Sequence, residues 1–432
     1  MPRMDRRLQK RYLLLVKQHM DVATALAAGI HALPQAGDSF AAAQAAWRFF
    51  DNPKATLPIL VEPLREMGRR GAGQSDSPFA LLIHDWSKVD FASHKAKIDQ
   101  VQLSNSMDHG YEMLTALMVD AATGTPLAPM EISLLASQGH HSTAQESALP
   151  RESHLDQILP VMQASRTWGV GKRLVHVIDR EADSLFDMRQ WVANEHLFLV
   201  RGDDRRVRFR EKSHLLTEIV EILRQESAFA FTREVEICGK TGKLFVAETA
   251  VVLDGPAWQV DENKKTVRVP GPALSVRLVV AQVRDEHDQG MAEWLLLTNA
   301  PADANAEMIA TWYYWRWRIK TFHKLIKAGG LQLEHWLQEN ASRIAKRLVV
   351  ACMACVVAWQ LEGQTTPAAE QCKKLLMDLS GRQTKRSRRV TTSGLLAGLH
   401  VLLMVLGVLD QYTPDELRKI AATAIPTYKS SG

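Results

Sequence analysis

Four residues around position 320 have a spacing that would gather phenolic and basic side chains on one helix face. They are Tyr313, Arg316, Lys320 and Lys327, within the stretch YYWRWRIKTFHKLIK. At about 100° per residue on an α-helix, these positions fall within a wedge of roughly 60°. A guanidinium can donate two parallel hydrogen bonds to a phosphate, and an ammonium offers a point charge, so this face could contact DNA phosphates. A solvated basic helix surface is the competing interpretation.

Two aspartates end apolar runs elsewhere in the chain. Asp85 closes FALLIHD, and Asp179 closes RLVHVID at the head of DREADSLF. Carboxylates at strand ends can converge on one point and hold a pair of Mg²⁺ ions roughly 4 Å apart, the arrangement that two-metal phosphodiester chemistry needs. The structural alternatives are a turn acid after a strand for Asp85 and a helix N-cap for Asp179.

The stretch from Tyr313 to Lys327 resembles the YREK signature of bacterial insertion-sequence transposases, the hairpin-forming, cut-and-paste DDE class with a ribonuclease-H-like core. Other strings similar to this family follow in its order: QAAWRFFDNP, GYEMLTALMVDAATGTPLAPM, DREADSLF and WLLLTNAP. The resemblance implies that Asp85 and Asp179 are the first two catalytic, metal-binding carboxylates, with Mg²⁺ as cofactor and Mn²⁺ as its substitute.

The same resemblance assigns roles to the other signature residues. Tyr313, Arg316 and Lys327 would contact phosphates beside the cleaved bond. Trp294, which opens WLLLT, would stack on a flipped-out base, and core packing is the competing role for this ring. The family's N-terminal helices bind the transposon end and its C-terminal helices form the dimer, so the implied partners are transposon-end duplex DNA, target DNA and a second copy of the chain.

Position 320 departs from the signature. The family has a glutamate there, the third metal-binding carboxylate, whereas this chain has Lys320. An ammonium cannot ligate Mg²⁺, and its repulsion of the ion is worth on the order of 4 kcal/mol per charge pair at ~4 Å and an effective dielectric of ~20. We expect Lys320 to form salt bridges with Asp85 and Asp179 instead, and to weaken or abolish metal binding. Replacement of the missing acid by Glu181 or Glu334 is conceivable.

Three functions therefore stay open. The first is a transposase that cleaves one strand, forms a hairpin and transfers the excised end into target DNA. The second keeps the fold and the DNA binding without the chemistry, as an end-binding protein or an inhibitor of transposition. The third is a hydrolytic nuclease on the same core, which the N-terminal helices and the nearly complete signature disfavour.

Composition allows a polyanionic partner without naming one. The 53 basic residues exceed the 48 acidic ones by five, and the pI is near 8.9. Basic side chains gather near the N-terminus and in a second run after position 380. The residues that we expect to bind DNA at the N-terminal end are Arg6, Arg7, Lys10, Arg48 and Lys54, and the second run comprises Arg382, Lys385, Arg386, Arg388 and Arg389.

Several classes of protein and site are not indicated. The apolar runs 348–359 and 395–409 are shorter than the ~20 residues of a membrane span and are expected to be buried helices. Cys352 and Cys355 lie in an apolar run without a second pair, which favours a core helix over zinc. Neither GVGKR nor CGKTGK has phosphate-loop spacing, so no nucleotide cofactor is expected. Few cysteines and no secretory signal indicate a bacterial cytoplasmic protein.

The elements that must position these residues form a mixed α/β pattern. Apolar runs, a hairpin around ATGTP and the helical DREADSLFDMRQWV predict a sheet with helices, and alternating residues after Asp204 predict a β-strand insertion. Pro63 and the glycine-rich GRRGAGQSDSP are expected to close the first domain. The expected domains are a helical end-binding domain (1–70), a ribonuclease-H-like core (71–203 and 290–370), the insertion (204–289) and a helical dimerisation region (371–432).

Overall fold

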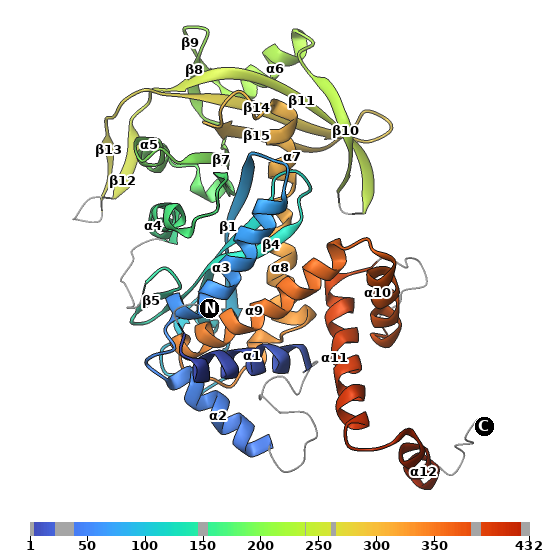
Figure 1. The fold of residues 1–432 in the computed structure, drawn as a ribbon. Coiled ribbons are helices and arrows are strands. Elements are labelled where there is room, and N and C mark those ends of the chain that lie inside the picture. Colours follow the sequence, from blue (N-terminus) through green and yellow to red (C-terminus); the bar gives the residue numbers. More distant parts are fainter. Residues whose placement is uncertain are drawn as a thin grey trace.

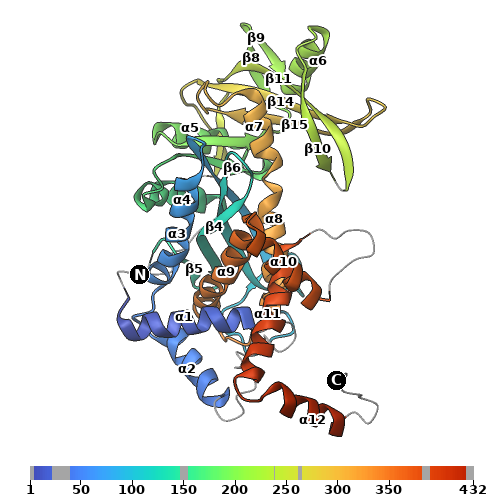
Figure 2. The same cartoon turned by 45° about the vertical axis from the view of Figure 1, so that its right-hand side comes forward.

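The computed structural model describes residues 4–21, 39–145, 154–237, 239–260, 265–381 and 390–424. The molecule is elongated, with most of the sheet towards one end and most of the helices towards the other (Figure 1). A view turned by 45° shows the same division, with α7 and α8 running from the strand-rich end towards the helices (Figure 2). The predicted mixed α/β class is confirmed.

The centre of the molecule is one mixed sheet. Strand β1 pairs antiparallel with β3 and parallel with β6, while β3–β4 is an antiparallel hairpin and β6–β7 a parallel pair. The order across this part of the sheet is therefore β5-β4-β3-β1-β6-β7. Its strands are β1 (Phe79–Asp90), β2 (Val101–Gln102), β3 (His109–Asp120), β4 (Pro126–Ala136), β5 (Gly139–Ser142), β6 (Arg173–Ile178) and β7 (Leu197–Arg201).

The strands that follow β7 in the chain extend this sheet, beginning with β15, which lies in the segment predicted as core, and continuing with strands of the predicted insertion. Strand β15 pairs antiparallel with β7, and β14, β11, β8 and β9 follow outwards, with β10 also paired to β11. The strands predicted between residues 204 and 289 are present, but this segment also contains helix α6, which was not predicted. The elements are β8 (Arg206–Phe209), β9 (Lys212–Leu215), α6 (Leu216–Gln225), β10 (Ala230–Ile237), β11 (Lys240–Leu253), β14 (Leu274–Arg284) and β15 (Gly290–Thr298), with β12 (Ala257–Val260) and β13 (Thr266–Val269) as a separate hairpin.

Helix α3 (Leu57–Gln74) corrects the predicted linker. The helix contains Pro63 and runs through most of the glycine-rich stretch. Two of its three glycines have a packing reason, because a Cβ at Gly68 would lie 2.5 Å from the sulfur of Met130, and one at Gly71 would lie 2.9 Å from a methyl of Leu127. Both partners belong to β4, so the glycines let the helix approach the sheet closely. The expected boundary near residue 70 is helical, and α3 packs on the core.

The remaining helices lie around the sheet and at the helical end. Helix α1 packs against α9 and α11, and α9 also contacts α3 and β4. The helices are α1 (Arg6–Asp21), α2 (Ser39–Asp51), α4 (Ile158–Ser165), α5 (Leu185–Ala193), α7 (Ala306–Tyr314), α8 (Trp317–Lys324), α9 (Ala341–Gly363), α10 (Pro367–Leu379), α11 (Thr392–Leu409) and α12 (Pro414–Ala424). Short turns are η2 (His154–Gln157), η3 (Arg166–Trp168), η4 (Arg180–Ala182), the π-turn η5 (Leu325–Gly329) and η6 (Leu333–His335).

Two of the described helices are long and apolar enough to cross a membrane by length and composition. In the most apolar 18-residue window of each helix, 72% of the window is buried in α9 but only 22% in α11. The prediction of a core helix is confirmed for α9, which buries Cys352 and Cys355. It is wrong for α11: Leu395 and Leu396 are buried, but the second half of the helix is exposed. Core helices of soluble proteins pass the same length test, so the feature alone is weak support for a membrane span.

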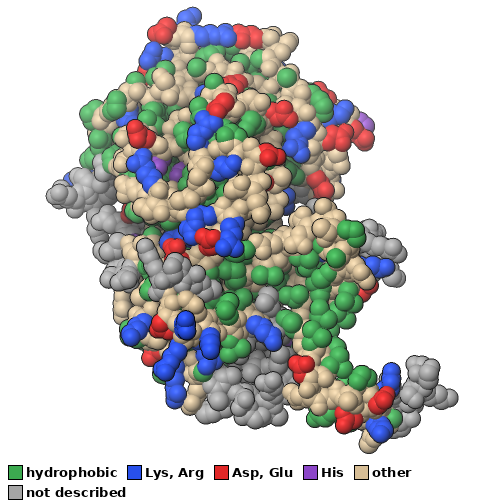
Figure 3. Space-filling model, viewed as in Figure 1, with side chains coloured by type: hydrophobic (Ala, Val, Ile, Leu, Met, Phe, Trp, Pro, Cys, Tyr) green, Lys and Arg blue, Asp and Glu red, His purple; other side chains and the backbone are tan. Residues whose placement is uncertain are grey.

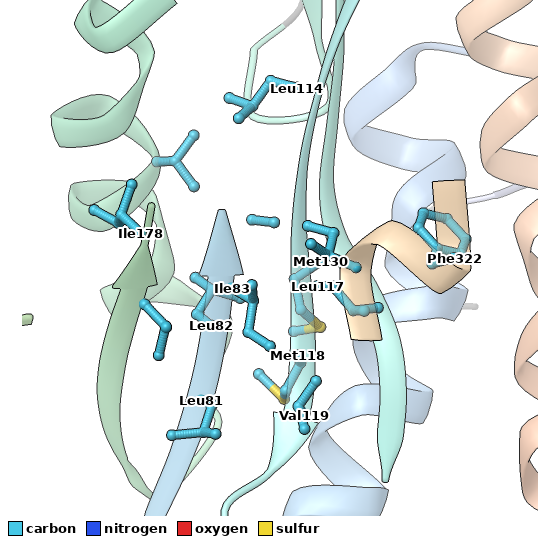
Figure 4. Packing of buried hydrophobic residues seen from close by; sticks show 14 of the residues in the cluster. Leu81, Leu82, Ile83, Leu114, Leu117, Met118, Val119, Met130, Ile178 and Phe322 are labelled. Atoms are coloured by element: carbon cyan, nitrogen blue, oxygen red, sulfur yellow. The ribbon is translucent and has the colours of Figure 1, made fainter. Parts of the chain in front are cut away.

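The core that fixes the site lies on β1, β3 and β4. Figure 4 shows Leu82 and Ile83 of β1 beside Leu117 and Met118 of β3, with Phe322 of α8 beside the strands. Phe322 is 1% exposed. Burial of this ring holds α8 against the sheet and so fixes where the other side chains of α8 lie.

Candidate functional site

Asp85 on β1 and Asp179, the residue directly after β6, lie level at two neighbouring parallel strands. Ile83 of β1 pairs with Val177 of β6, and both aspartates follow two residues later. Since side chains alternate along a strand, the two carboxylates point to the same face of the sheet. Paired strands are roughly 4.8 Å apart, so backbone pairing brings the acids together. The structure thus joins two residues that stand 94 positions apart in the sequence.

Asp85 is held by Lys320. The ammonium nitrogen of Lys320 lies 3.0 Å from Oδ1 and 2.7 Å from Oδ2 of the carboxylate. The Asp85 side chain is 3% exposed, whereas that of Lys320 is 43% exposed. Burial raises the pKa of Asp85, and the attraction of Lys320 and then of Arg316 opposes that shift without reversing it. The expected salt bridge of Lys320 is therefore present to Asp85, whereas the described ion pair of Asp179 is with Arg316.

Asp179 is held by Tyr313 and Arg316. The hydroxyl of Tyr313 donates to Oδ1 at 2.9 Å, and Nη1 of Arg316 lies 3.1 Å from Oδ2. The backbone N–H of Arg180 also donates to Oδ1, so Asp179 is the N-cap of η4, as its alternative role anticipated. Burial alone would raise the pKa of Asp179, but Arg316, the Arg180 N–H and Tyr313 together lower it. Burial raises the pKa of Tyr313 to about 12, which keeps this hydroxyl a donor.

The helical spacing predicted that the four signature residues share one continuous helix face. This prediction is wrong. Helix α7 ends at Tyr314, Arg316 donates from its backbone N–H to the carbonyl of Tyr313, and α8 begins at Trp317. Lys327 lies in the π-turn η5. Its ammonium contacts Glu334 at 2.9 Å and the carbonyl of Lys88 at 2.5 Å. Tyr313, Arg316 and Lys320 therefore contact the two aspartates, whereas Lys327 contacts Glu334 and the backbone of Lys88 instead.

Several buried polar atoms at this site make no hydrogen bond among the described residues. They are Oδ2 of Asp85, Nδ1 of His323, and Nε and Nη1 of Arg316. Oδ2 and Nη1 do have ion-pair contacts, but these contacts lack hydrogen-bond direction. Unsatisfied buried polar groups cost about 1–3 kcal/mol each, so folded proteins contain few of them. Of these four atoms, only Nε of Arg316 has neither a hydrogen bond nor an ion-pair contact among the described residues.

Two residues of the site were missed by the sequence analysis. His323 stands one turn after Lys320, with Nδ1 3.8 Å from Oδ2 of Asp85. Burial first, then Lys320 and Lys327, lower the pKa of His323 to about 3, so the ring is neutral. Trp317 is 56% exposed, and its ring lies 5.2 Å from the guanidinium carbon of Arg316. The i, i+3 spacing of His323 from Lys320 was the available signal for the histidine.

Trp294 lies next to the site but inside the core. It is 7% exposed in β15, and its ring centroid is 5.5 Å from that of Tyr313. In this conformation the ring presents little surface for stacking, so the competing packing role is the one seen. The base-stacking role stays a prediction that needs a rearrangement of this side chain.

The N-terminal basic residues lie on the surface far along the chain from the acid pair. Arg6, Arg7 and Lys10 are exposed on α1, Arg48 on α2, and Lys54 in the turn before α3. Figure 3 shows Lys and Arg side chains in the region of α1 and α2. None of these five residues contacts Asp85 or Asp179 among the described hydrogen bonds and ion pairs. The second basic run, 382–389, lies outside the described residues.

The donor set does not match a two-metal centre. In the described part of the chain, no group of three or more His, Cys, Asp or Glu side chains is arranged to hold a metal ion. The two acids are each taken by a cation, and an ammonium stands where a third carboxylate is required. The substitutes considered above do not fill the gap, because Glu334 pairs with Lys327 and accepts from the backbone N–H of Asp90 at 3.2 Å, and Glu181 is exposed in η4.

Neither a protein-family model nor a curated protein matches this chain in sequence comparisons.

Proposed function

We propose that the chain is a transposon-end DNA-binding protein with the architecture of a DDE transposase, whose cleavage centre is blocked by Lys320. The strand order β4-β3-β1-β6-β7, with an antiparallel hairpin on one side of β1 and two parallel strands on the other, supports a ribonuclease-H-like core. The level position of Asp85 and Asp179 at adjacent strands supports their assignment as the first two acids of that class.

One observation carries the choice of binding over cleavage. The ammonium of Lys320 lies within 3.0 Å of both oxygens of Asp85. Position 320 is the one at which the family has a metal-ligating glutamate. Because Asp179 is likewise paired with Arg316, both acids are neutralised by the protein itself. The residues present do not fit a Mg²⁺ or Mn²⁺ pair, so no metal-dependent step is part of the proposed function of this chain.

The exposed second half of α11 supports a homodimer. Residues 392–409 contain no Asp, Glu, Lys or Arg. Met404, Val405, Leu406 and Leu409 are between 37% and 49% exposed. Figure 3 shows hydrophobic side chains along this part of the molecule. An uncharged apolar face suits a second copy of itself, since an isologous interface places the same patch on both sides.

A strand-cleavage assay tests the blocked centre. The substrate is duplex DNA with the ends of the element that carries this gene, incubated with Mg²⁺ and either the unaltered chain or Lys320→Glu. We expect the variant to nick about a thousandfold faster, because repulsion of ~4 kcal/mol at one ligand position corresponds to that factor. Lys324→Glu is the matched control, since it makes the same charge reversal one turn further along α8. Equal nicking by the unaltered chain and Lys320→Glu would restore the active transposase as the better interpretation.

A further inference from the structure

We infer that Lys320 is a phosphate anchor: together with Arg316 it binds one phosphate group of DNA in the place where a metal-dependent centre would use its ion. The inference rests on the proposed function, because it names the group that the same site binds. Its consequence is that DNA is held at the acid pair without any divalent cation.

The first support is the unused donor capacity of Lys320. An ammonium has three N–H donors, and the described contacts of this one are to the two oxygens of Asp85. At least one donor is left. The side chain is 43% exposed while Asp85 is 3% exposed, so the lysine covers the carboxylate and faces solvent on its other side. A ligand that approaches the acid pair meets the ammonium first.

The second support is Arg316, whose Nε has no acceptor among the described residues. Its side chain is 5% exposed and Nη1 lies 3.1 Å from Oδ2 of Asp179, yet Nε has neither a hydrogen bond nor an ion-pair contact among the described residues. The guanidinium carbon of Arg316 lies 5.3 Å from the ring centroid of Tyr313 and 5.2 Å from that of Trp317, so both rings pack near this group. A phosphate oxygen is a strong acceptor for such donors.

The third support is the charge balance. Asp85 with Lys320 and Asp179 with Arg316 form two neutral pairs, whereas two or three unpaired carboxylates would repel DNA until metal ions neutralised them. A neutral site with spare donors accepts a phosphate monoanion directly. Lys320 thus converts a site that needs metal ions into one that does not.

Substitutions at the two partners should have opposite effects on DNA binding. Lys320→Gln removes the ammonium and leaves the charge of Asp85 exposed to the phosphate, so affinity should fall. Asp85→Asn removes the carboxylate that competes for the ammonium, so affinity should hold or rise. A merely structural role for the pair would lower affinity in both variants, because both break the same contact.

The test is a fluorescence titration of element-end duplex DNA in EDTA at several salt concentrations. One phosphate contact contributes a slope of about −0.9 in log K against log salt, which is roughly eightfold in affinity at 0.1 M salt. Lys320→Gln should lose that amount and flatten the slope by about one, while Lys320→Arg should retain most of the affinity. Lys212→Gln, the same change at an exposed position on β9, should match the unaltered chain. Thermal melts establish that each variant is folded.

Each outcome decides the matter. Equal affinity and slope for Lys320→Gln and the unaltered chain would overturn the anchor, as would a loss of affinity in Asp85→Asn or a need for Mg²⁺ in the unaltered chain. If the unaltered chain binds element-end DNA no better than random duplex, the proposed function itself fails, and that result is separate from the comparison among variants.

Discussion

Lys320 covers Asp85 from the solvent side, with its ammonium 2.7 Å from one carboxylate oxygen and 3.0 Å from the other. The pair joins a half-exposed cation to a nearly buried anion. Removing Lys320 leaves a buried, unpaired carboxylate, whereas removing the Asp85 charge leaves a half-exposed ammonium that water can solvate. We therefore expect the first change to destabilise the fold more than the second.

We expect Lys320→Met to destabilise the fold by about 1–3 kcal/mol, because the buried carboxylate of Asp85 is left without its cation. Adding Asp85→Asn should recover most of the loss. Burial raises the pKa of Asp85, and a raised folded-state pKa gives stability that is present below the unfolded pKa and lost as pH rises through the folded one. The cost of Lys320→Met relative to the double variant should therefore shrink from pH 7 towards pH 5 in urea unfolding. A constant cost would mean that the carboxylate is not the cause.

Three buried histidines should make the fold acid-sensitive. His84 of β1 and His176 of β6 share a hydrogen bond of 2.9 Å, and the ring of His196, just before β7, packs on His176. Burial lowers the pKa of His84 to about 3 and that of His196 to about 4, and it lowers the pKa of His176 well below 6.5.

Because these folded-state pKa values are depressed, the unfolded chain binds more protons between pH 6.5 and 4, and stability is lost as pH falls through that window. His176→Met should reduce the pH slope of the unfolding free energy by up to about 1.4 kcal/mol per pH unit. His287→Met, at a histidine side chain that is 75% exposed, is the control. An unchanged slope in His176→Met would show that this cluster does not set the acid response.

Gly398 should reverse the usual effect of alanine in a helix. A Cβ at this position of α11 would lie 1.9 Å from the carbonyl oxygen of Leu376 in α10. Alanine normally stabilises a helix by roughly 0.5–1 kcal/mol over glycine, but here backbone must move. We expect Gly398→Ala to lower the free energy of unfolding by about 1–3 kcal/mol. Gly73→Ala in α3, where no atom lies within 4 Å, should be neutral or stabilising. Equal shifts in melting temperature would contradict the close approach.

The proposed dimer contact should depend on the exposed half of α11. Replacing Val405 and Leu406 by glutamate places two charges on a face without charged residues, and we expect the dimer in the DNA complex to dissociate at least about thirtyfold more readily, the effect of losing ~2 kcal/mol at an interface centre. Light scattering coupled to size-exclusion chromatography measures the mass. Leu337→Glu, at another exposed leucine, is the control. A dimer that survives the double change uses a different surface.

The central strands could be predicted from the sequence because each is a short apolar run bounded by turn residues. FALLIHD, RLVHVID and WLLLTNA form parts of β1, β6 and β15, and the pairing of β1 with β6 brings the two predicted aspartates together. Helix α6 was missed, although Leu216, Ile219, Val220 and Leu223 have helical spacing and are its buried residues. The segments on either side have the alternating pattern of strands, so the whole region was predicted as β.

The course of the signature region could not be predicted from periodicity. The break between α7 and α8 contains neither proline nor glycine, and it is fixed by distant contacts. The indole N–H of Trp312 donates to the carbonyl of Ala121 at 3.0 Å, and Trp315 packs where a side chain at Gly124 would lie. The prediction of a linker in the glycine-rich part of α3 was wrong for a related reason, because glycine there allows close packing on β4 rather than a turn. Both features depend on tertiary contacts that a local pattern does not contain.

The separation of Asp85 and Asp179 is set by the backbone pairing of β1 with β6, two strands in the interior of one sheet. Position 320 lies outside both strands, so a side-chain change there does not alter the strand pairing that spaces the acids. On the proposed function, the loss of cleavage is therefore a change of charge at an unchanged backbone. A lineage that lost the reaction in this way would keep the means to regain it through one side chain.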